Sequence, residues 1–290
     1  MGAGRGGPPV GGLPALVARR SVPGSSVSVG PRWQSAGMEI AEHLTALTAE
    51  GSLLAAAAER VDHAAPVPGC PAWQVGDVVR HTGLVHRWAA AAVREGGRDA
   101  SRYPDDDGAG LVGADLVEWF RTGHAALVDT LSSADPDVSA FTFLPAPSPL
   151  AFWARRQTHE TGIHRADVES GGGAITPFDR DEALDGIDEL VGGFAARRSK
   201  DGGPGTALGV LPTDSDQGWL VRPGAEPVRA AAAAGGADAV LRGTASDLHL
   251  LLWNRPTGEI DSSGDPAVLA DWRKRIRVRW GGPGPRRGRP

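Results

Sequence analysis

Residues 153–167 read WARRQTHETGIHRAD, a run in which polar and charged residues outnumber apolar ones. The run lies inside a longer stretch, about 150–168, whose pattern is typical of a helix. Glu160 and His164 are four residues apart, so one helical turn brings their side chains to the same face. A polar strip on a core-forming helix costs free energy of burial unless another group satisfies it. The run therefore predicts a buried helix that carries a binding site.

The same run resembles the zinc-protease motif H-E-x-x-H, but it is one residue too long. At about 100° per residue, His159 and His164 are separated by roughly 140° around the helix axis. Two imidazoles that far apart on one helix cannot easily share a metal ion. The zinc-protease motif is therefore rejected, and only Glu160 and His164 remain as a pair.

A second histidine-bearing helix is predicted at about 73–94. In this helix His81 falls on the apolar stripe that should face the core, whereas His86 is rotated away from it. An inward-facing His81 and the pair Glu160 and His164 would converge in a helical bundle, where they suit zinc or another divalent cation with an open coordination position. Taken separately, each of these residues is more often structural, as a hydrogen-bonded core histidine or a helix-surface pair, so both interpretations stay open.

The rest of the chain predicts two domains. Helical patterns separated by short breaks indicate an antiparallel bundle, and short strands followed by helices indicate a small α+β domain. The expected helices of the bundle cover about 39–61, 73–94, 113–131, 150–168 and 179–198. The expected strands are 207–211, 218–222, 228–233, 237–241 and 259–261, with helices at 246–253 and 266–276. We expect the boundaries to be 38–199 for the bundle and 206–280 for the α+β domain, with a linker at 200–205 and disordered ends at 1–37 and 281–290.

Composition excludes several classes of protein. Thirty Lys and Arg against 35 Asp and Glu give a net charge of -5 without basic blocks, which argues against nucleic acid or an anionic membrane as the partner. Cys70 is the single cysteine, so neither an intrachain disulfide nor a Cys-rich zinc site can form, and a reducing, cytoplasmic location is expected. No apolar run reaches the roughly 20 residues needed to cross a bilayer. Residues 2–7 match G-x-G-x-x-G, but they lack the strand and helix that a dinucleotide site requires.

Two stretches together resemble one known family. PGCPAWQVGDVVRH at 68–81, followed by VHRW at 85–88, and the run at 153–167 look like the mycothiol-dependent maleylpyruvate isomerase family. Residues 237–248 and 251–255 are similar to the smaller carboxy-terminal domain of that family, so the resemblance covers 38 to about 280. It implies a DinB-like four-helix bundle followed by the smaller α+β domain.

The resemblance also implies a chemistry. A divalent metal, typically zinc, would be held by His81, Glu160 and His164, and mycothiol would be the thiol cofactor. A metal-coordinated thiol is deprotonated near neutral pH, so Cys70 need not be the nucleophile. In the family reaction the thiolate adds to the cis double bond of maleylpyruvate, the new single bond rotates, and elimination leaves fumarylpyruvate.

Three arginines are candidates for binding carboxylates, because a guanidinium matches a carboxylate in geometry. Arg255 is assigned to catalysis, and Arg87 and Arg165 to cofactor binding, with simple surface charge as the alternative interpretation. Gly83 and Gly162 lie in mid-helix, where glycine costs about 1 kcal/mol relative to alanine, which indicates room for a ligand or a close helix approach.

Two other functions remain open. One is a mycothiol S-transferase that conjugates electrophiles without isomerising them. The other is a non-catalytic metal-binding interaction module. The expected partners are mycothiol and a small electrophilic substrate, with neither nucleic acid nor a membrane.

Overall fold

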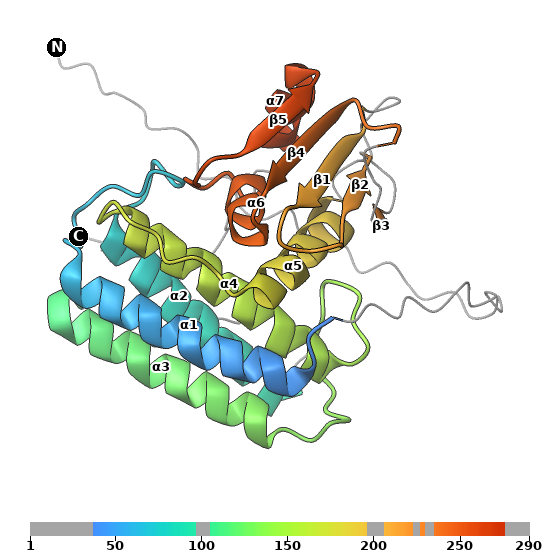
Figure 1. The fold of residues 1–290 in the computed structure, drawn as a ribbon. Coiled ribbons are helices and arrows are strands. Elements are labelled where there is room, and N and C mark those ends of the chain that lie inside the picture. Colours follow the sequence, from blue (N-terminus) through green and yellow to red (C-terminus); the bar gives the residue numbers. More distant parts are fainter. Residues whose placement is uncertain (1–36, 97–104, 196–205, 223–226, 230–234, 276–290) are drawn as a thin grey trace, which may run out of the picture. The chain divides into compact units, whose positions relative to one another are not determined.

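Four long helices lie side by side in the amino-terminal part of the chain (Figure 1). Helix α1 packs against α3 and α4, and α2 packs against the same two helices. The four helices are α1 (Ile40–Arg60), α2 (Val75–Arg94), α3 (Gly113–Ser133) and α4 (Pro149–Ser170). The predicted helical bundle is therefore confirmed.

The computed structural model describes residues 37–96, 105–195, 206–222, 227–229 and 235–275. The bundle and the carboxy-terminal part belong to one compact unit that spans 37–277. The proposed linker at 200–205 and the proposed disordered ends, apart from Gly37, lie outside the described residues. Among the described helices, none is long and apolar enough to cross a membrane.

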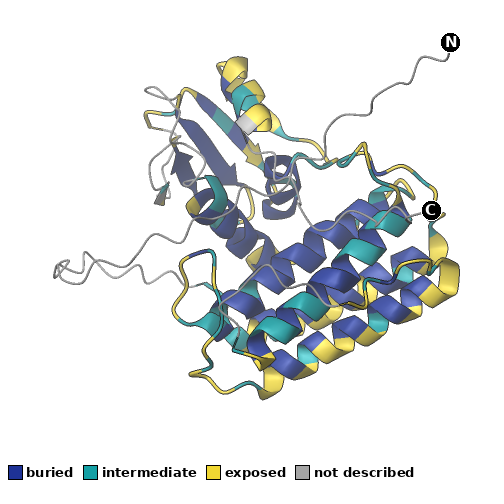
Figure 2. Ribbon diagram, turned by 180° about the vertical axis from the view of Figure 1, so that it is seen from behind, coloured by how far each residue is buried: buried dark blue, intermediate teal, exposed yellow. Residues whose placement is uncertain are grey.

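Helix α4 is the central helix of the structure. It begins after Ser148, whose Oγ accepts a hydrogen bond from the amide of Ala151 at 3.1 Å, and Pro149 occupies the first turn. Both features are typical of helix starts. Almost every residue from Leu150 to Glu169 is buried (Figure 2), because α1 and α2 pack against this helix, and α5 and the carboxy-terminal part bond to it as well. A helix covered on several sides needs no single apolar stripe, which explains its polar composition.

The carboxy-terminal part is a small α+β domain, as predicted. Helix α5 leads through a π-helical turn, η1, into a five-stranded sheet of order β3-β2-β1-β4-β5, in which only the pair β1 and β4 is parallel. The elements are α5 (Arg180–Asp188), η1 (Glu189–Ala195), β1 (Leu208–Pro212), β2 (Trp219–Val221), β3 (Val228–Arg229), β4 (Ala239–Gly243), α6 (Ala245–Leu252), β5 (Asp261–Gly264) and α7 (Pro266–Arg275). The sequence assigns the helix predicted at 179–198 to the bundle, but α5 packs mainly against α6 of the carboxy-terminal part. It changes to π geometry after 188, and its last residues lie outside the described range.

The two mid-helix glycines mark close approaches of neighbouring elements. A Cβ on Gly83 would lie 2.3 Å from a ring carbon of Trp119 in α3, and a Cβ on Gly162 would lie 2.6 Å from the ring of Phe178. Real Cβ atoms do not come that close to other heavy atoms, and overpacking a core in this way destabilises it. Of the two explanations offered by the sequence, close packing is the one that the contacts support.

Candidate metal centre

The three candidate ligands meet between α2 and α4. Glu160 Oε1 lies 3.4 Å from His81 Nε2 and 3.3 Å from His164 Nε2. Neighbouring ligand atoms around a tetrahedral zinc ion, with bonds of 2.0–2.1 Å, are separated by about 3.3 Å. Two imidazoles and one carboxylate at this spacing therefore fit a zinc-sized cation and leave a fourth position open. Glu160 and His164 are buried, whereas the His81 side chain is 10% exposed, so the cluster borders solvent at His81.

Each ligand of α4 is held by a further polar group. Arg156 donates from Nη2 to Glu160 Oε2 at 3.1 Å, which leaves Oε1 facing the imidazoles. On the opposite side of the cluster, His164 Nδ1 lies 3.0 Å from Asp167 Oδ2. Such a contact fixes the ring so that Nε2 points to the ligand position, as carboxylates commonly do for metal-binding histidines.

Asp167 is in turn bound by Arg255, which follows α6 in the carboxy-terminal domain. Arg255 donates from Nε to Oδ1 at 2.7 Å and from Nη2 to Oδ2 at 2.9 Å. Arg255, Asp167 and His164 therefore form a continuous chain from the small domain to a candidate ligand. The sequence pointed to Arg255 as a carboxylate-binding candidate. It placed Asp167 on the same polar strip as Glu160 and His164, but gave it no role at the site.

The pKa shifts of the cluster favour an ionised Glu160 and a protonated His164. Burial alone would raise the pKa of Glu160, but His164, His81 and Arg156 hold it well below its usual range. Burial would lower the pKa of His164, yet its contacts with Asp167 and Glu160 raise it to about 9. The pKa of His81 is lowered by burial despite the opposing contact with Glu160. A cation bound here would replace the proton on His164, so its affinity should fall as the pH falls.

Trp73 closes one side of the cluster, and sequence reasoning gave it no role at the site. Its ring is stacked on His164 with 6.3 Å between centroids and meets His81 edge-on at 5.0 Å. The residue lies two positions before the start of α2 and belongs to the motif at 68–81. No spacing rule points to it, because its position depends on the loop before the helix.

Cys70 lies next to Arg255, with 3.3 Å between its Sγ and Arg255 Nη2. Burial and the charge of Asp167 raise the pKa of this thiol to about 11, although Arg255 acts in the opposite direction. Cys70 is therefore protonated at neutral pH, which does not suit a nucleophile.

Arg87 is engaged with α3. Its guanidinium lies 3.8 Å from the ring centre of Trp119 and donates to the carbonyl oxygens of Trp119 and Gly83 at 2.8 and 3.1 Å. These contacts use the guanidinium for packing, and the structure does not bring it together with the three candidate ligands.

Arg165 is fully buried, so the alternative of a surface charge is wrong for this residue. It donates from Nε to Glu50 Oε2 at 2.7 Å and from Nη1 to Glu169 Oε2 at 2.8 Å. A third partner is the carbonyl oxygen of Thr176. These partners lie away from the candidate ligands, and a role in cofactor binding stays a prediction.

The two remaining histidines of the motifs are both buried. His159 points to α5, where its Nε2 lies 2.7 Å from Asp185 Oδ1, in agreement with the angular argument that separated it from His164. The expectation that His86 turns away from the buried stripe is wrong. His86 is fully buried, because it lies between α4 and α3. Its Nε2 is 2.9 Å from Thr161 Oγ1 of α4, and its ring contacts Phe120 and His124 of α3.

Glu182 of α5 is a buried carboxyl group whose protonation should make the stability of the protein depend on pH. Burial and the charge of Glu50 raise the pKa of Glu182 to about 9. The folded chain therefore holds this proton more tightly than the unfolded chain, so the stabilisation is complete below pH 4.5 and is lost as the pH rises through 9. We expect the free energy of unfolding to fall across this window, by at most about 1.4 kcal/mol per pH unit. Urea unfolding at several pH values should show a smaller fall for Glu182→Gln, while the exposed control Glu59→Gln should behave as the wild type.

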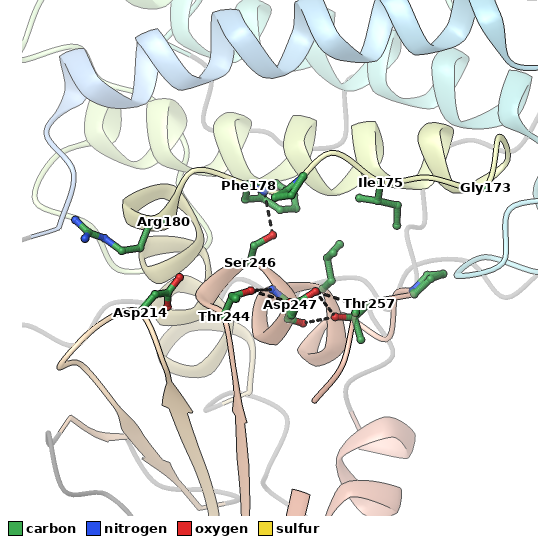
Figure 3. A pocket seen from close by; sticks show the side chains of 13 residues that line it. Gly173, Ile175, Phe178, Arg180, Asp214, Thr244, Ser246, Asp247 and Thr257 are labelled. Carbon is green, nitrogen blue, oxygen red and sulfur yellow. Dashed lines mark hydrogen bonds between the residues drawn. The ribbon is translucent and has the colours of Figure 1, made fainter. Parts of the chain in front are cut away.

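A cavity of about 490 Å³ lies between the loop after α4 and the start of α6 (Figure 3). Its polar groups are already hydrogen-bonded: Ser246 Oγ accepts from the amide of Phe178 at 2.9 Å, and Asp247 accepts from Thr257 Oγ1 at 2.9 Å. None of the three candidate ligands lines it.

Comparisons with known proteins identify the family of the two domains. The family model described as the mycothiol maleylpyruvate isomerase N-terminal domain matches residues 44–169, and the MDMPI C-terminal domain matches 181–271. Crystal structures of the mycothiol-dependent maleylpyruvate isomerase and of a histidine-to-alanine mutant are each similar to this chain, with a TM-score of 0.56 and 16% identity. Each match covers 78% of this chain and 93% of the other. At such low identity this likeness shows the fold alone. No curated protein matches the sequence.

Proposed function

Because this chain belongs to the mycothiol-dependent maleylpyruvate isomerase family, we propose that it is a metal-dependent enzyme that uses mycothiol to isomerise maleylpyruvate or a related small electrophile. Metal binding is proposed because ligand atoms of His81, Glu160 and His164 lie within 4.8 Å of one another. The lone, protonated Cys70 supports an external thiol as the nucleophile. The cytoplasm, expected from the single cysteine, is the proposed location.

The residues of the chain would divide the work as follows. A zinc ion would be held by His81, Glu160 and His164, and it would lower the pKa of a thiol that coordinates it. Arg156 and Asp167 orient Glu160 and His164, and Trp73 covers the two imidazoles on one side. Arg255 keeps Asp167 ionised and in place, so the small domain contributes to the geometry of the site.

Removing the metal tests this proposal. We expect chelation to abolish the isomerisation of maleylpyruvate in the presence of mycothiol, and added Zn²⁺ to restore it in the wild type but not in His81→Ala. Isomerisation is followed by the conversion of maleylpyruvate to its trans product, and the mycothiol concentration is measured in the same reaction.

The thiol balance separates the two enzyme hypotheses. An isomerase returns its thiol, so mycothiol should stay constant while product accumulates. Net consumption of mycothiol with a generic electrophile, without isomerisation, would instead favour the S-transferase. Full isomerase activity after complete metal removal would contradict the proposal.

A further inference from the structure

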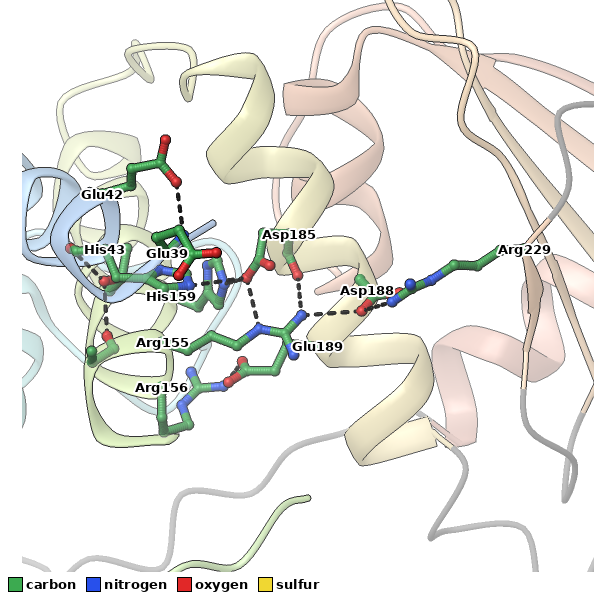
Figure 4. A network of polar contacts seen from close by, with 12 residues as sticks. Glu39, Glu42, His43, Arg155, Arg156, His159, Asp185, Asp188, Glu189 and Arg229 are labelled. Atoms are coloured by element: carbon green, nitrogen blue, oxygen red, sulfur yellow. Dashed lines mark hydrogen bonds and ion pairs between the residues drawn. The ribbon is translucent and has the colours of Figure 1, made fainter. Parts of the chain in front are cut away.

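A second group of metal-binding residue types lies within the described residues, on the other face of α4. It consists of His43 of α1, His159 of α4 and Asp185 of α5 (Figure 4), and one ligand-capable atom of each lies within 4.8 Å of the other two. Asp185 Oδ1 is 2.7 Å from His159 Nε2 and 3.6 Å from His43 Nε2. All three residues are buried. The donor set, two imidazoles and one carboxylate, is the same as at His81, Glu160 and His164.

Several imidazole nitrogens at this cluster have no hydrogen-bond partner among the described residues. They are Nδ1 of His43, Nδ1 of His159 and both ring nitrogens of His249. His249 belongs to α6, is fully buried and lies edge-on to His159, with 6.1 Å between ring centroids. Buried polar groups are normally paired, so the hydrogen bonding of this buried imidazole group is incomplete among the described residues. The atoms that would face a cation are Nε2 of His43 and Nε2 of His159, on the side of the rings where Asp185 lies.

His249 lies close to the Nδ1 side of His159, whose Nε2 now contacts Asp185 and would have to bind the cation instead. A Cβ added to Gly186 would lie 2.6 Å from His249 Nε2 and 3.1 Å from His159 Nδ1, so glycine allows the two rings to approach each other. If His159 carries its proton on Nδ1, its Nε2 is available to a cation and His249 can accept the hydrogen bond from Nδ1. Burial lowers the pKa of His43 to about 3 and that of His249 well below its usual range, so both rings are neutral.

Arg155 limits the affinity of this cluster. Its Nε donates to the same oxygen, Asp185 Oδ1, at 2.7 Å, whereas at the first cluster Arg156 binds the carboxylate oxygen that does not face the imidazoles. Arg155 also pairs with Asp188 at 3.2 Å, which neutralises part of its charge. Because the partners of a ligand commonly change metal affinity by 10- to 100-fold, we expect binding here to be about 10- to 100-fold weaker than at His81, Glu160 and His164.

We propose that His43, His159 and Asp185 form a second, weaker site for a divalent cation of the zinc type, with His249 supporting His159 from the small domain. The ligands come from α1, α4 and α5, and the supporting imidazole from α6. A cation bound there would connect α1 and α4 of the bundle to α5 of the carboxy-terminal part.

Metal-free protein titrated with Zn²⁺, followed by native mass spectrometry, tests this site. The wild type should bind a first equivalent tightly and a second about 10- to 100-fold more weakly. His43→Ala should lose only the second equivalent, and His81→Ala only the first. His86→Ala is the matched control, because it removes a buried bundle histidine that belongs to neither cluster, and it should keep both.

Asp185→Asn is the second variant, since it preserves the shape of the side chain, and it should also lose the weaker equivalent while circular dichroism shows a folded chain. A wild type that binds a single equivalent would overturn the second site, as would a weak equivalent that persists in both His43→Ala and Asp185→Asn. Loss of the tight equivalent alone in His81→Ala concerns only the proposed function, so the two proposals fail separately.

Discussion

Replacing Glu160 by glutamine is expected to remove the tightly bound metal and to lower isomerase activity by more than about 100-fold. The change keeps the size of the side chain but replaces an anionic oxygen, 3.4 and 3.3 Å from the two imidazoles, by a neutral one. Loss of an outer partner alone costs 10- to 100-fold in metal affinity, so loss of the charged ligand should cost more. Metal content by mass spectrometry and the rate of isomerisation measure the two effects.

Glu169→Gln is the matched control for this prediction. Glu169 is also a buried glutamate of α4 that pairs with an arginine, at 2.8 Å from Arg165, but it lies outside the candidate metal centre. This variant should lose stability, because it breaks a buried ion pair, and should keep its metal. Equal loss of metal in the two variants, or full metal content in Glu160→Gln, would contradict the assignment of Glu160 as a ligand.

The fold could be predicted from sequence because its elements have clear local signals. Prolines and glycines separate helices whose apolar residues recur at helical spacing, and the helix and strand positions agree with the structure to within a few residues. The burial of α4 on several sides could not be predicted from periodicity, since its buried positions include many polar residues and therefore form no single apolar stripe. The orientation of His86 was predicted wrongly because α2 was expected to bury a single apolar stripe, whereas it packs against both α3 and α4.

The candidate site divides into a local and a non-local part. Glu160 and His164 follow from their spacing of four residues, and His81 from the apolar stripe of its own helix. The link between Asp167 and Arg255 joins residues 88 positions apart, and no spacing rule encodes it. The cluster of His43, His159 and Asp185 draws on three separate helices, so it too becomes visible only in the folded chain.

Replacing Arg255 by methionine is expected to lower the free energy of unfolding by about 3–5 kcal/mol, the usual cost of removing one partner from a buried ion pair. Asp167, which is 1% exposed, would lose two hydrogen bonds from Arg255 and the positive charge that stabilises its buried carboxylate. The contact between Asp167 Oδ2 and His164 Nδ1 would then be less well fixed, so the zinc affinity should fall about 10- to 100-fold. Urea unfolding of the metal-free protein measures the first effect, and competition with a zinc chelator the second.

The double variant Asp167→Asn with Arg255→Met separates charge from geometry. It removes the unpaired buried carboxylate, so most of the lost stability should return, but a neutral amide orients His164 less strongly and the zinc affinity should stay low. This combination is expected only if Arg255 acts through Asp167 as a positioning residue. If Arg255 instead acts solely by contacting the substrate, Arg255→Met will raise KM or lower kcat at unchanged zinc affinity, and the chain from Arg255 to His164 will have no part in holding the metal.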